Sequence, residues 1–311
     1  MKLAFLYAGQ GSQKVGMGRD LYEAYPAFRT VWDDAAVDFD LKTLCWEGPE
    51  ETLSQTRYTQ PCMVAFAAGI TAVLREEGIV PSLAAGLSLG EYSALHAAGV
   101  WDAAQAVSLA SFRGRAMEEA VRDRSCGMVA VLGLSREALA DICRRASSLG
   151  VAEIANYNCP GQLVIGGDAA AVEEASRLAR EAGARRTVPL KVSGPFHTSL
   201  MAPAGEALRE RFREVHFNAP AFPVVHNATA RPAQQGEEID QLLIRQVQSP
   251  VYFEDSLRYL EDQGVDTAVE IGPGRALSAF VKKTAPGIRV WAVEDVPSLT
   301  AAVAALKGEA S

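Results

Sequence analysis

The sequence predicts an α/β protein with a large domain built on a mostly parallel sheet and a smaller unit inserted into it. Strand-length apolar runs alternate with helix-forming segments along most of the chain, as in parallel sheets covered by helices. Residues 126–192 follow instead the order β-α-β-β-α-β of a ferredoxin-like unit. We therefore expect residues 1–125 and 193–311 to form the large domain and residues 126–192 the small one.

The chain begins with a predicted buried strand, residues 2–8, whose apolar run is too short for a signal peptide. A glycine-rich loop follows at residues 9–18. A dinucleotide-binding fingerprint needs a third glycine where this loop has Lys14, so that interpretation fails. The loop either exposes backbone N–H groups, which can bind an oxyanion, or is a plain surface turn.

Helices are predicted over residues 19–36 and 60–77, and residues 86–90 then have the form G-x-S-x-G around Ser88. A short strand before this motif and helix-forming residues after it predict a nucleophile elbow, as in hydrolase-like α/β domains. The serine is then held on a sharp turn at a helix N-terminus, where negative charge is favoured. This arrangement suits acyl transfer, although a plain strand–helix turn has the same pattern.

The next predicted helix, residues 101–119, carries Arg113 among apolar neighbours. A guanidinium in such surroundings needs an anionic partner, because burying it unpaired is costly. The helix alone favours a structural ion pair with a glutamate, and the alternative is an anionic group of a substrate.

The remaining predicted elements complete the small β-α-β-β-α-β unit and the alternating strands and helices of the large domain. In the small unit, strands are predicted at residues 128–132, 151–156, 162–166 and 187–192, with helices at 135–147 and 169–182. In the returning large domain, helices are predicted at residues 203–215, 239–248, 251–263, 275–283 and 299–307, and strands at 223–228, 267–271 and 289–293. The alternation of strands and helices after residue 192 extends the parallel sheet.

Composition excludes several classes of function. The 38 acidic and 30 basic residues give a net charge of −8, which argues against a general nucleic-acid binder. Five cysteines at irregular spacing, without a cysteine–histidine cluster, predict free thiols and no metal site. No apolar run reaches the roughly 18 residues of a membrane span. We expect a cytoplasmic monomer without a membrane or nucleic-acid partner.

Four histidines are candidates for the base that activates Ser88: His96, His197, His216 and His226. His197 is the best of them, because it lies in a glycine- and proline-ordered loop between the two predicted domains. We expect His96 to pack, His216 to be solvated and His226 to be a satisfied core histidine. An ordinary esterase places its histidine near the end of the chain, whereas some 85 residues follow His226 here.

Six motifs in order resemble those of one family. They are GQGSQ at residues 9–13, GLSLGEYSA at 86–94, Arg113, GPFH at 194–197, Gln246 with SPV at 249–251, and EIGPG at 270–274. By these motifs the chain is identified as a member of the malonyl-CoA:acyl-carrier-protein transacylases, the FabD-like acyltransferases of fatty-acid and polyketide synthesis. The resemblance covers the chain from the first strand to about residue 295.

The resemblance implies a role for each catalytic residue. Ser88 attacks the malonyl thioester, and His197 takes its proton and later returns it to the leaving thiol. Gln246 orients the imidazole through a carbonyl oxygen. The backbone N–H groups of Gln10 and Leu89 form the oxyanion hole.

The resemblance also implies the substrates. Malonyl passes from malonyl-CoA to the serine and then to the phosphopantetheine thiol of acyl carrier protein, without a cofactor. Arg113 pairs with the free malonyl carboxylate, which excludes acetyl because the buried charge is then unpaired. Phe196 is similar to the residue of malonyl-type sites, whereas a smaller residue accompanies methylmalonyl use. Leu87 replaces the usual histidine, which puts the acyl preference and the balance of transfer and hydrolysis in question.

Coenzyme A and carrier proteins are acidic, so a local basic rim is needed on this acidic chain. The candidates, each otherwise an ordinary solvated charge, are Arg185, Arg186, Lys191, Arg275, Lys282 and Lys283. The alternatives are a trans-acting polyketide acyltransferase, an acyl hydrolase, a serine esterase and a non-catalytic carrier-binding scaffold. The presence of Ser88, His197 and Arg113 together disfavours the scaffold.

Overall fold

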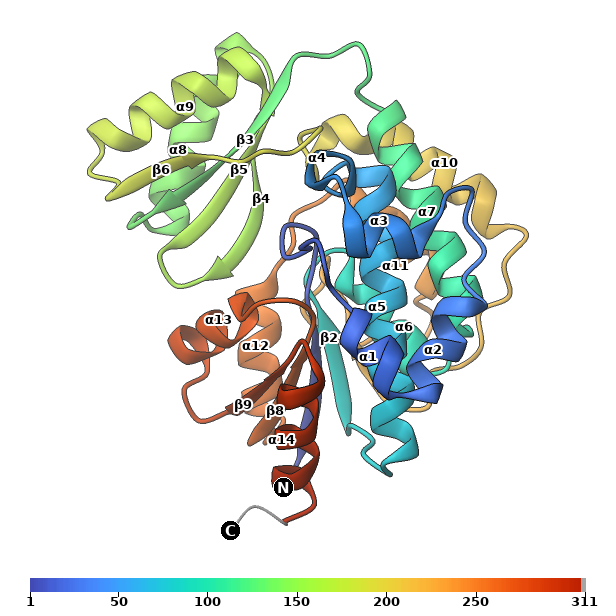
Figure 1. Ribbon diagram of the computed structural model, residues 1–311. Helices are drawn as coiled ribbons and strands as arrows, with labels where there is room; N and C mark the ends of the chain where they lie inside the picture. Colours follow the sequence, from blue (N-terminus) through green and yellow to red (C-terminus); the bar gives the residue numbers. More distant parts are fainter. Residues whose placement is uncertain (309–311) are drawn as a thin grey trace.

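The computed structural model describes residues 1–308 and contains two sheets (Figure 1). One sheet is parallel, with the order β7-β2-β1-β8-β9. Its strands are β1 (Leu3–Tyr7), β2 (Leu83–Gly86), β7 (Val224–Val225), β8 (Thr267–Ile271) and β9 (Arg289–Val293). The other is antiparallel, with the order β4-β5-β3-β6. Its strands are β3 (Cys126–Leu132), β4 (Ala152–Cys159), β5 (Gln162–Asp168) and β6 (Arg186–Pro189). The predicted α/β fold with a ferredoxin-like sheet is confirmed.

Helices cover both sheets. Those of the first 125 residues are α1 (Arg19–Ala24), α2 (Pro26–Asp33), α3 (Leu41–Glu47), α4 (Glu50–Leu53), α5 (Thr56–Glu76), α6 (Gly90–Ala97) and α7 (Ala103–Glu119). Those that follow are α8 (Arg136–Ala146), α9 (Ala169–Glu181), α10 (Ala202–Phe212), α11 (Ile239–Val247), α12 (Phe253–Asp262), α13 (Ala276–Thr284) and α14 (Val296–Leu306). Two short 3₁₀ helices span Ser147–Leu149 and Ser199–Met201.

The parallel sheet is buried on both faces. Side chains of a strand alternate between faces, so Phe5 and Tyr7 of β1 join the core formed with α2, α5, α6 and α7. Ala4 and Leu6 join a second core formed with α12 and α13. Because both faces are covered, the strand reads as one unbroken apolar run rather than an alternating one.

Helices α8 and α9 pack on one face of the antiparallel sheet. An apolar core containing Val129, Leu163 and Ile165 lies between the sheet and α8 and α9. Figure 1 shows this unit at the upper left, above α12 and α13. Its strand β4 is bonded to the rest of the chain, since Tyr157 N donates to Val251 O and Val251 N to Ala155 O, each at 2.9 Å. The two parts are therefore joined by backbone hydrogen bonds as well as by the chain crossings.

Several predicted boundaries are wrong, for local reasons. The single helix at residues 19–36 is two helices, because Tyr25 before Pro26 is extended and Pro26 begins α2. The helix predicted from Gln60 already begins at Thr56 and contains Pro61. The predicted strand at 223–228 is reduced to Val224–Val225, and α3 and α4 were not predicted.

Two absences bear on function. In the part of the chain that the structure describes, no helix is long and apolar enough to span a membrane. Residues 1–308 also hold no group of three or more His, Cys, Asp or Glu side chains arranged to bind a metal ion.

Candidate active site

Ser88 lies on a sharp turn between β2 and α6. Its φ of 54° is in the left-handed region, which costs energy for a residue other than glycine. A Cβ on Gly86 would lie 1.9 Å from the carbonyl carbon of Gly90, and one on Gly90 would lie 2.2 Å from the oxygen of Tyr7. Both glycines are therefore required sterically. The turn is held by Asn227, whose Oδ1 accepts from Ser88 N at 2.7 Å.

His197 meets this serine from the loop before α10. Its Nε2 lies 2.6 Å from Ser88 Oγ, and its Nδ1 lies 2.9 Å from the backbone oxygen of Gln246. A carbonyl oxygen only accepts, so Nδ1 carries a proton and Nε2 of the neutral ring accepts from the serine. Burial, and then the charge of Arg113, lower the pKa of His197 to about 3. The imidazole is thus neutral near pH 7 and able to act as a base.

Arg113 lies fully buried beside the same serine. Its Nη1 donates to Gln60 Oε1 at 2.9 Å, and its Nη2 donates to Gln246 Oε1 at 3.0 Å and to Ser88 Oγ at 3.3 Å. The Tyr92 ring lies 5.4 Å from the guanidinium carbon. Within residues 1–308 no carboxylate forms an ion pair with Arg113, so the glutamate pair that the helix alone favoured is not formed. Burial lowers the pKa of this guanidinium, and an anion placed beside it would be stabilised.

The backbone N–H groups of Gln10 and Leu89 remain free. Neither amide donates a hydrogen bond to the protein among the residues that the structure describes. Gln10 is held in place by its side chain, which donates to Thr56 Oγ1 at 2.9 Å. Leu89 occupies the N-cap position of α6, where amides have no partner within the helix. Leu89 directly follows Ser88, and Gln10 lines the same cavity as Ser88, so both amides belong to residues beside the serine.

A small cavity of about 110 Å³ lies over Ser88. It is lined by Gly9, Gln10, Gln60, Leu87, Ser88, Met117, Met128, Asn156, Leu190, Val192, Phe196 and His197. Met128 and Asn156 belong to the antiparallel sheet, so both parts of the molecule form its wall. Its volume is below that of a cavity of about 150 Å³ that holds benzene, so the space directly at Ser88 suits a small group.

A buried network behind the serine was not predicted from the sequence. Glu91 is fully buried on α6, and its carboxylate accepts from Asn227 N at 2.9 Å and from Gln246 Nε2 at 3.0 Å. It also contacts His226 Nδ1 at 2.7 Å, so the expected core histidine is buried and bonded through one of its two ring nitrogens. Gln246 Nε2 donates in addition to Ser88 O at 2.8 Å. The only sequence signal for this network was a carboxylate on the elbow helix, one turn after the serine.

The other two histidines lie as expected. His96 is buried and its Nδ1 lies 3.1 Å from the oxygen of Trp101, whereas His216 is exposed. Neither is part of the cluster around Ser88.

A nucleophile on an elbow, a neutral base, two free amides and a buried guanidinium define an α/β enzyme of the serine acyl-transfer class. The sequence matches the acyl transferase domain family over residues 4–306. The chain belongs to this family and is an acyltransferase.

Relatives share nearly the whole chain. The malonyl CoA-acyl carrier protein transacylase of Bacillus subtilis (strain 168) is 42% identical over 311 residues, which cover 99% of this chain and 98% of the relative. A solved structure of the Streptococcus pneumoniae protein called MCAT is 47% identical, with a TM-score of 0.92 and coverage of 97% and 99%. A second similar structure is a type II PKS acyl-carrier protein in complex with its malonyl-transacylase, at 39% identity, a TM-score of 0.94 and coverage of 97% and 99%.

Proposed function

We propose that this acyltransferase moves a malonyl group from malonyl-CoA to the phosphopantetheine thiol of an acyl carrier protein, in fatty-acid or polyketide synthesis. The observation that carries the substrate assignment is the position of Arg113, whose Nη2 lies 3.3 Å from Ser88 Oγ. An acyl group bound to this serine reaches the guanidinium only if its carboxylate is a few bonds from the reacting carbon. A short diacid such as malonate meets that condition.

The first half-reaction uses groups that are already aligned. Ser88 Oγ attacks the thioester carbonyl while His197 Nε2 accepts the serine proton. The carbonyl oxygen becomes negative and takes hydrogen bonds from the amides of Gln10 and Leu89. When the tetrahedral intermediate collapses, the C–S bond breaks and the imidazolium returns the proton to the coenzyme A sulfur.

The second half-reaction reverses these steps with a different thiol. His197 takes the proton of the phosphopantetheine thiol, the thiolate attacks the malonyl ester, and Ser88 leaves with the proton that the imidazolium returns. The Gln246 carbonyl accepts from Nδ1 and stabilises the imidazolium formed in both halves. Two thioesters and a serine are sufficient for this exchange, and we propose that it needs no cofactor.

The rest of the assignment concerns the surroundings of the site. We propose that Phe196 and Leu87 shape the acyl cavity and that residues 126–192 form a separate small domain that lines one side of it. We also propose that the enzyme works as a cytoplasmic monomer. We propose that acyl carrier protein docks on a basic rim. The six candidate basic residues are all exposed, and none of them forms an ion pair within the described chain. The candidates are Arg185, Arg186, Lys191, Arg275, Lys282 and Lys283.

Intact-protein mass spectrometry tests the proposal. The enzyme is incubated briefly with malonyl-CoA, methylmalonyl-CoA or acetyl-CoA, and holo acyl carrier protein is then added. We expect a malonyl adduct that is absent in Ser88→Ala and that moves to the carrier protein. A preferred acetyl adduct would contradict the role of Arg113, and rapid release of free malonate in place of transfer would support a hydrolase.

A further inference from the structure

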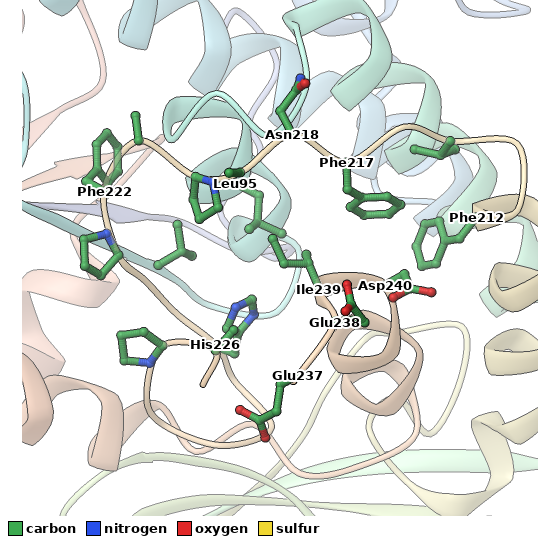
Figure 2. Close-up of a pocket in the computed structure, with 18 residues that line it drawn as sticks. Leu95, Phe212, Phe217, Asn218, Phe222, His226, Glu237, Glu238, Ile239 and Asp240 are labelled. Carbon is green, nitrogen blue, oxygen red and sulfur yellow. The ribbon is translucent and has the colours of Figure 1, made fainter. Parts of the chain in front are cut away.

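A second cavity, of about 850 Å³, lies apart from the catalytic serine (Figure 2). Its 18 lining residues come from α6, from residues 212–226 and from residues 232–240. Ser88, Arg113 and His197 are not among them. Nothing in the acyl transfer proposed above uses this space.

The floor of the cavity is apolar and rich in rings. Phe212, Phe217 and Phe222 line it together with Leu95 and Ile239 (Figure 2). Phe212 and Phe217 pack edge to face, with ring centroids 5.3 Å apart. Such a surface takes an apolar, preferably aromatic, body.

The rim of the cavity is negative. Glu237, Glu238 and Asp240 lie along one side of it (Figure 2), and its described lining contains no lysine or arginine. Glu237 is paired with Arg231, whose Nη1 lies at 2.6 Å, whereas Glu238 and Asp240 have no cationic partner within residues 1–308. Two carboxylates thus remain to attract a cation and to repel an anion.

The imidazole of His226 forms part of the floor. Its side chain is 3% exposed, and Figure 2 shows the imidazole among the lining residues. Nδ1 is occupied by the Glu91 carboxylate at 2.7 Å, and Nε2 has no hydrogen-bond partner among the described residues. Because Nδ1 is engaged by the carboxylate, Nε2 is the ring nitrogen that remains for a ligand in the cavity.

We propose that this cavity is a binding site for a small amphiphilic amine. The aromatic body lies on Phe212, Phe217 and Phe222 beside the His226 ring, and the carboxylates of Glu238 and Asp240 balance the charge of the protonated nitrogen. An anionic ligand such as a fatty acid or a nucleotide would face two unpaired carboxylates instead. The proposal does not rest on the function proposed for Ser88.

Isothermal titration of the full chain with two matched probes tests the chemistry of the ligand. The probes are 2-(1-naphthyl)ethylamine and 1-naphthylacetate, which share the ring system and differ in the sign of charge. We expect the amine to bind about tenfold more tightly or better, because the carboxylate probe meets like charges. Equal affinity of the two probes, or no binding of the amine, would overturn the proposal.

Variants locate the binding. Glu238→Gln combined with Asp240→Asn is expected to weaken amine binding about fivefold and to leave the carboxylate probe no weaker. The matched control, Asp34→Asn with Glu173→Gln, removes the same charge at two exposed positions outside the cavity and should leave both affinities unchanged. Equal effects of the two double variants would mean that only net charge matters and would refute the site.

Two further measurements examine the floor. His226→Ala is expected to weaken amine binding, because the ring contact at the floor of the cavity is lost. Since this variant also disturbs Glu91, hydrogen exchange of the unmodified protein with bound amine serves as the independent readout. Protection is expected in residues 212–224 and 232–240, and protection confined to other segments would contradict the proposal.

Discussion

The antiparallel sheet packs α8 and α9 over a core of Val, Ile, Leu and Ala side chains, with charged residues such as Arg177 and Glu174 paired on its surface. The parallel sheet differs at the carboxyl end of β2, where Arg113, Glu91 and Gln246 are fully buried. Burying charge is costly, so such groups persist only where hydrogen bonds or chemistry require them. The antiparallel sheet with α8 and α9 is therefore a structural unit, whereas the carboxyl end of the parallel sheet holds the reactive groups.

This contrast predicts different effects for substitutions in the two regions. A change in the polar network should alter catalysis even when the new side chain has the same size. A change in the apolar core of the small sheet should alter stability and leave the chemistry intact.

The largest expected effect is that of Arg113→Gln. Loss of the guanidinium should lower kcat/KM for malonyl-CoA about 10³-fold, because a buried charge pair with the substrate disappears, and should raise activity with acetyl-CoA. Acylation of Ser88 by each donor is followed by mass spectrometry. Arg115→Gln, on an exposed face of the same helix, is the control. An unchanged preference for malonyl-CoA over acetyl-CoA would contradict a role of the buried guanidinium in substrate selection.

Glu91→Gln tests the network behind the serine. It keeps the size of the side chain but places an amide against donors, so we expect a loss of about 3 kcal/mol in stability and about 10²-fold in kcat. Glu270→Gln is matched to it, because Glu270 is also fully buried and accepts from Leu277 N and Ser278 N, away from Ser88. Urea unfolding and turnover are measured for both variants. Equal losses of turnover in the two variants would mean that the effect on catalysis is not specific to the network behind Ser88.

Leu163→Ala tests the structural role of the antiparallel sheet and its helices. Leu163 is 1% exposed in the small core, so truncation should cost about 3 kcal/mol of unfolding free energy, while acylation at 25 °C stays within about twofold of the parent. Leu6→Ala in β1 makes the same truncation beneath the Gln10 loop and should lower both quantities. A large loss of acylation in Leu163→Ala would contradict the division of roles.

The pH dependence of stability tests the buried base. The pKa of His197 is lowered to about 3, so the unfolded chain binds a proton near pH 6.5 while the folded chain does not. Stability is therefore complete above pH 6.5 and falls as the pH drops, by about 2 kcal/mol between pH 7 and pH 5 from this group. His197→Gln removes this contribution, so urea unfolding of the two proteins should differ in slope over that range. Parallel slopes would show that the imidazole titrates normally in the folded state.

The smallest expected effect is that of Leu87→His. Leu87 is half-buried at the acyl cavity, and a polar ring there should change the ratio of carrier transfer to hydrolysis by about threefold, less than 1 kcal/mol. The ratio is obtained from the free malonate and malonyl-carrier formed in one reaction. A shift of the same size in Leu190→His, at another wall of this cavity, would mean that the position has no special role.

Local patterns in the sequence predicted more of the strands than of the site. The run at residues 267–271 matches β8 at both ends, since a strand buried on both faces is a continuous apolar segment. The break at Pro26 was missed, although the rule that a residue before proline avoids the helix explains it. Ser88, His197 and Arg113 were found by motif, whereas Asn227 and Glu91 were not assigned a role, because ordinary polar residues carry no local signal of their partners.

The sequence by itself determined the α/β alternation, the elbow around Ser88 and membership of the acyltransferase family, because these depend on neighbours in the chain. Only the tertiary structure decided which groups meet, since Ser88 and His197 are 109 residues apart and Glu91 and Asn227 are 136 apart. It also decided that Arg113 has no carboxylate partner within residues 1–308 and that a second, acid-rimmed cavity exists. Contacts of that range arise from packing of whole elements, which no local periodicity encodes.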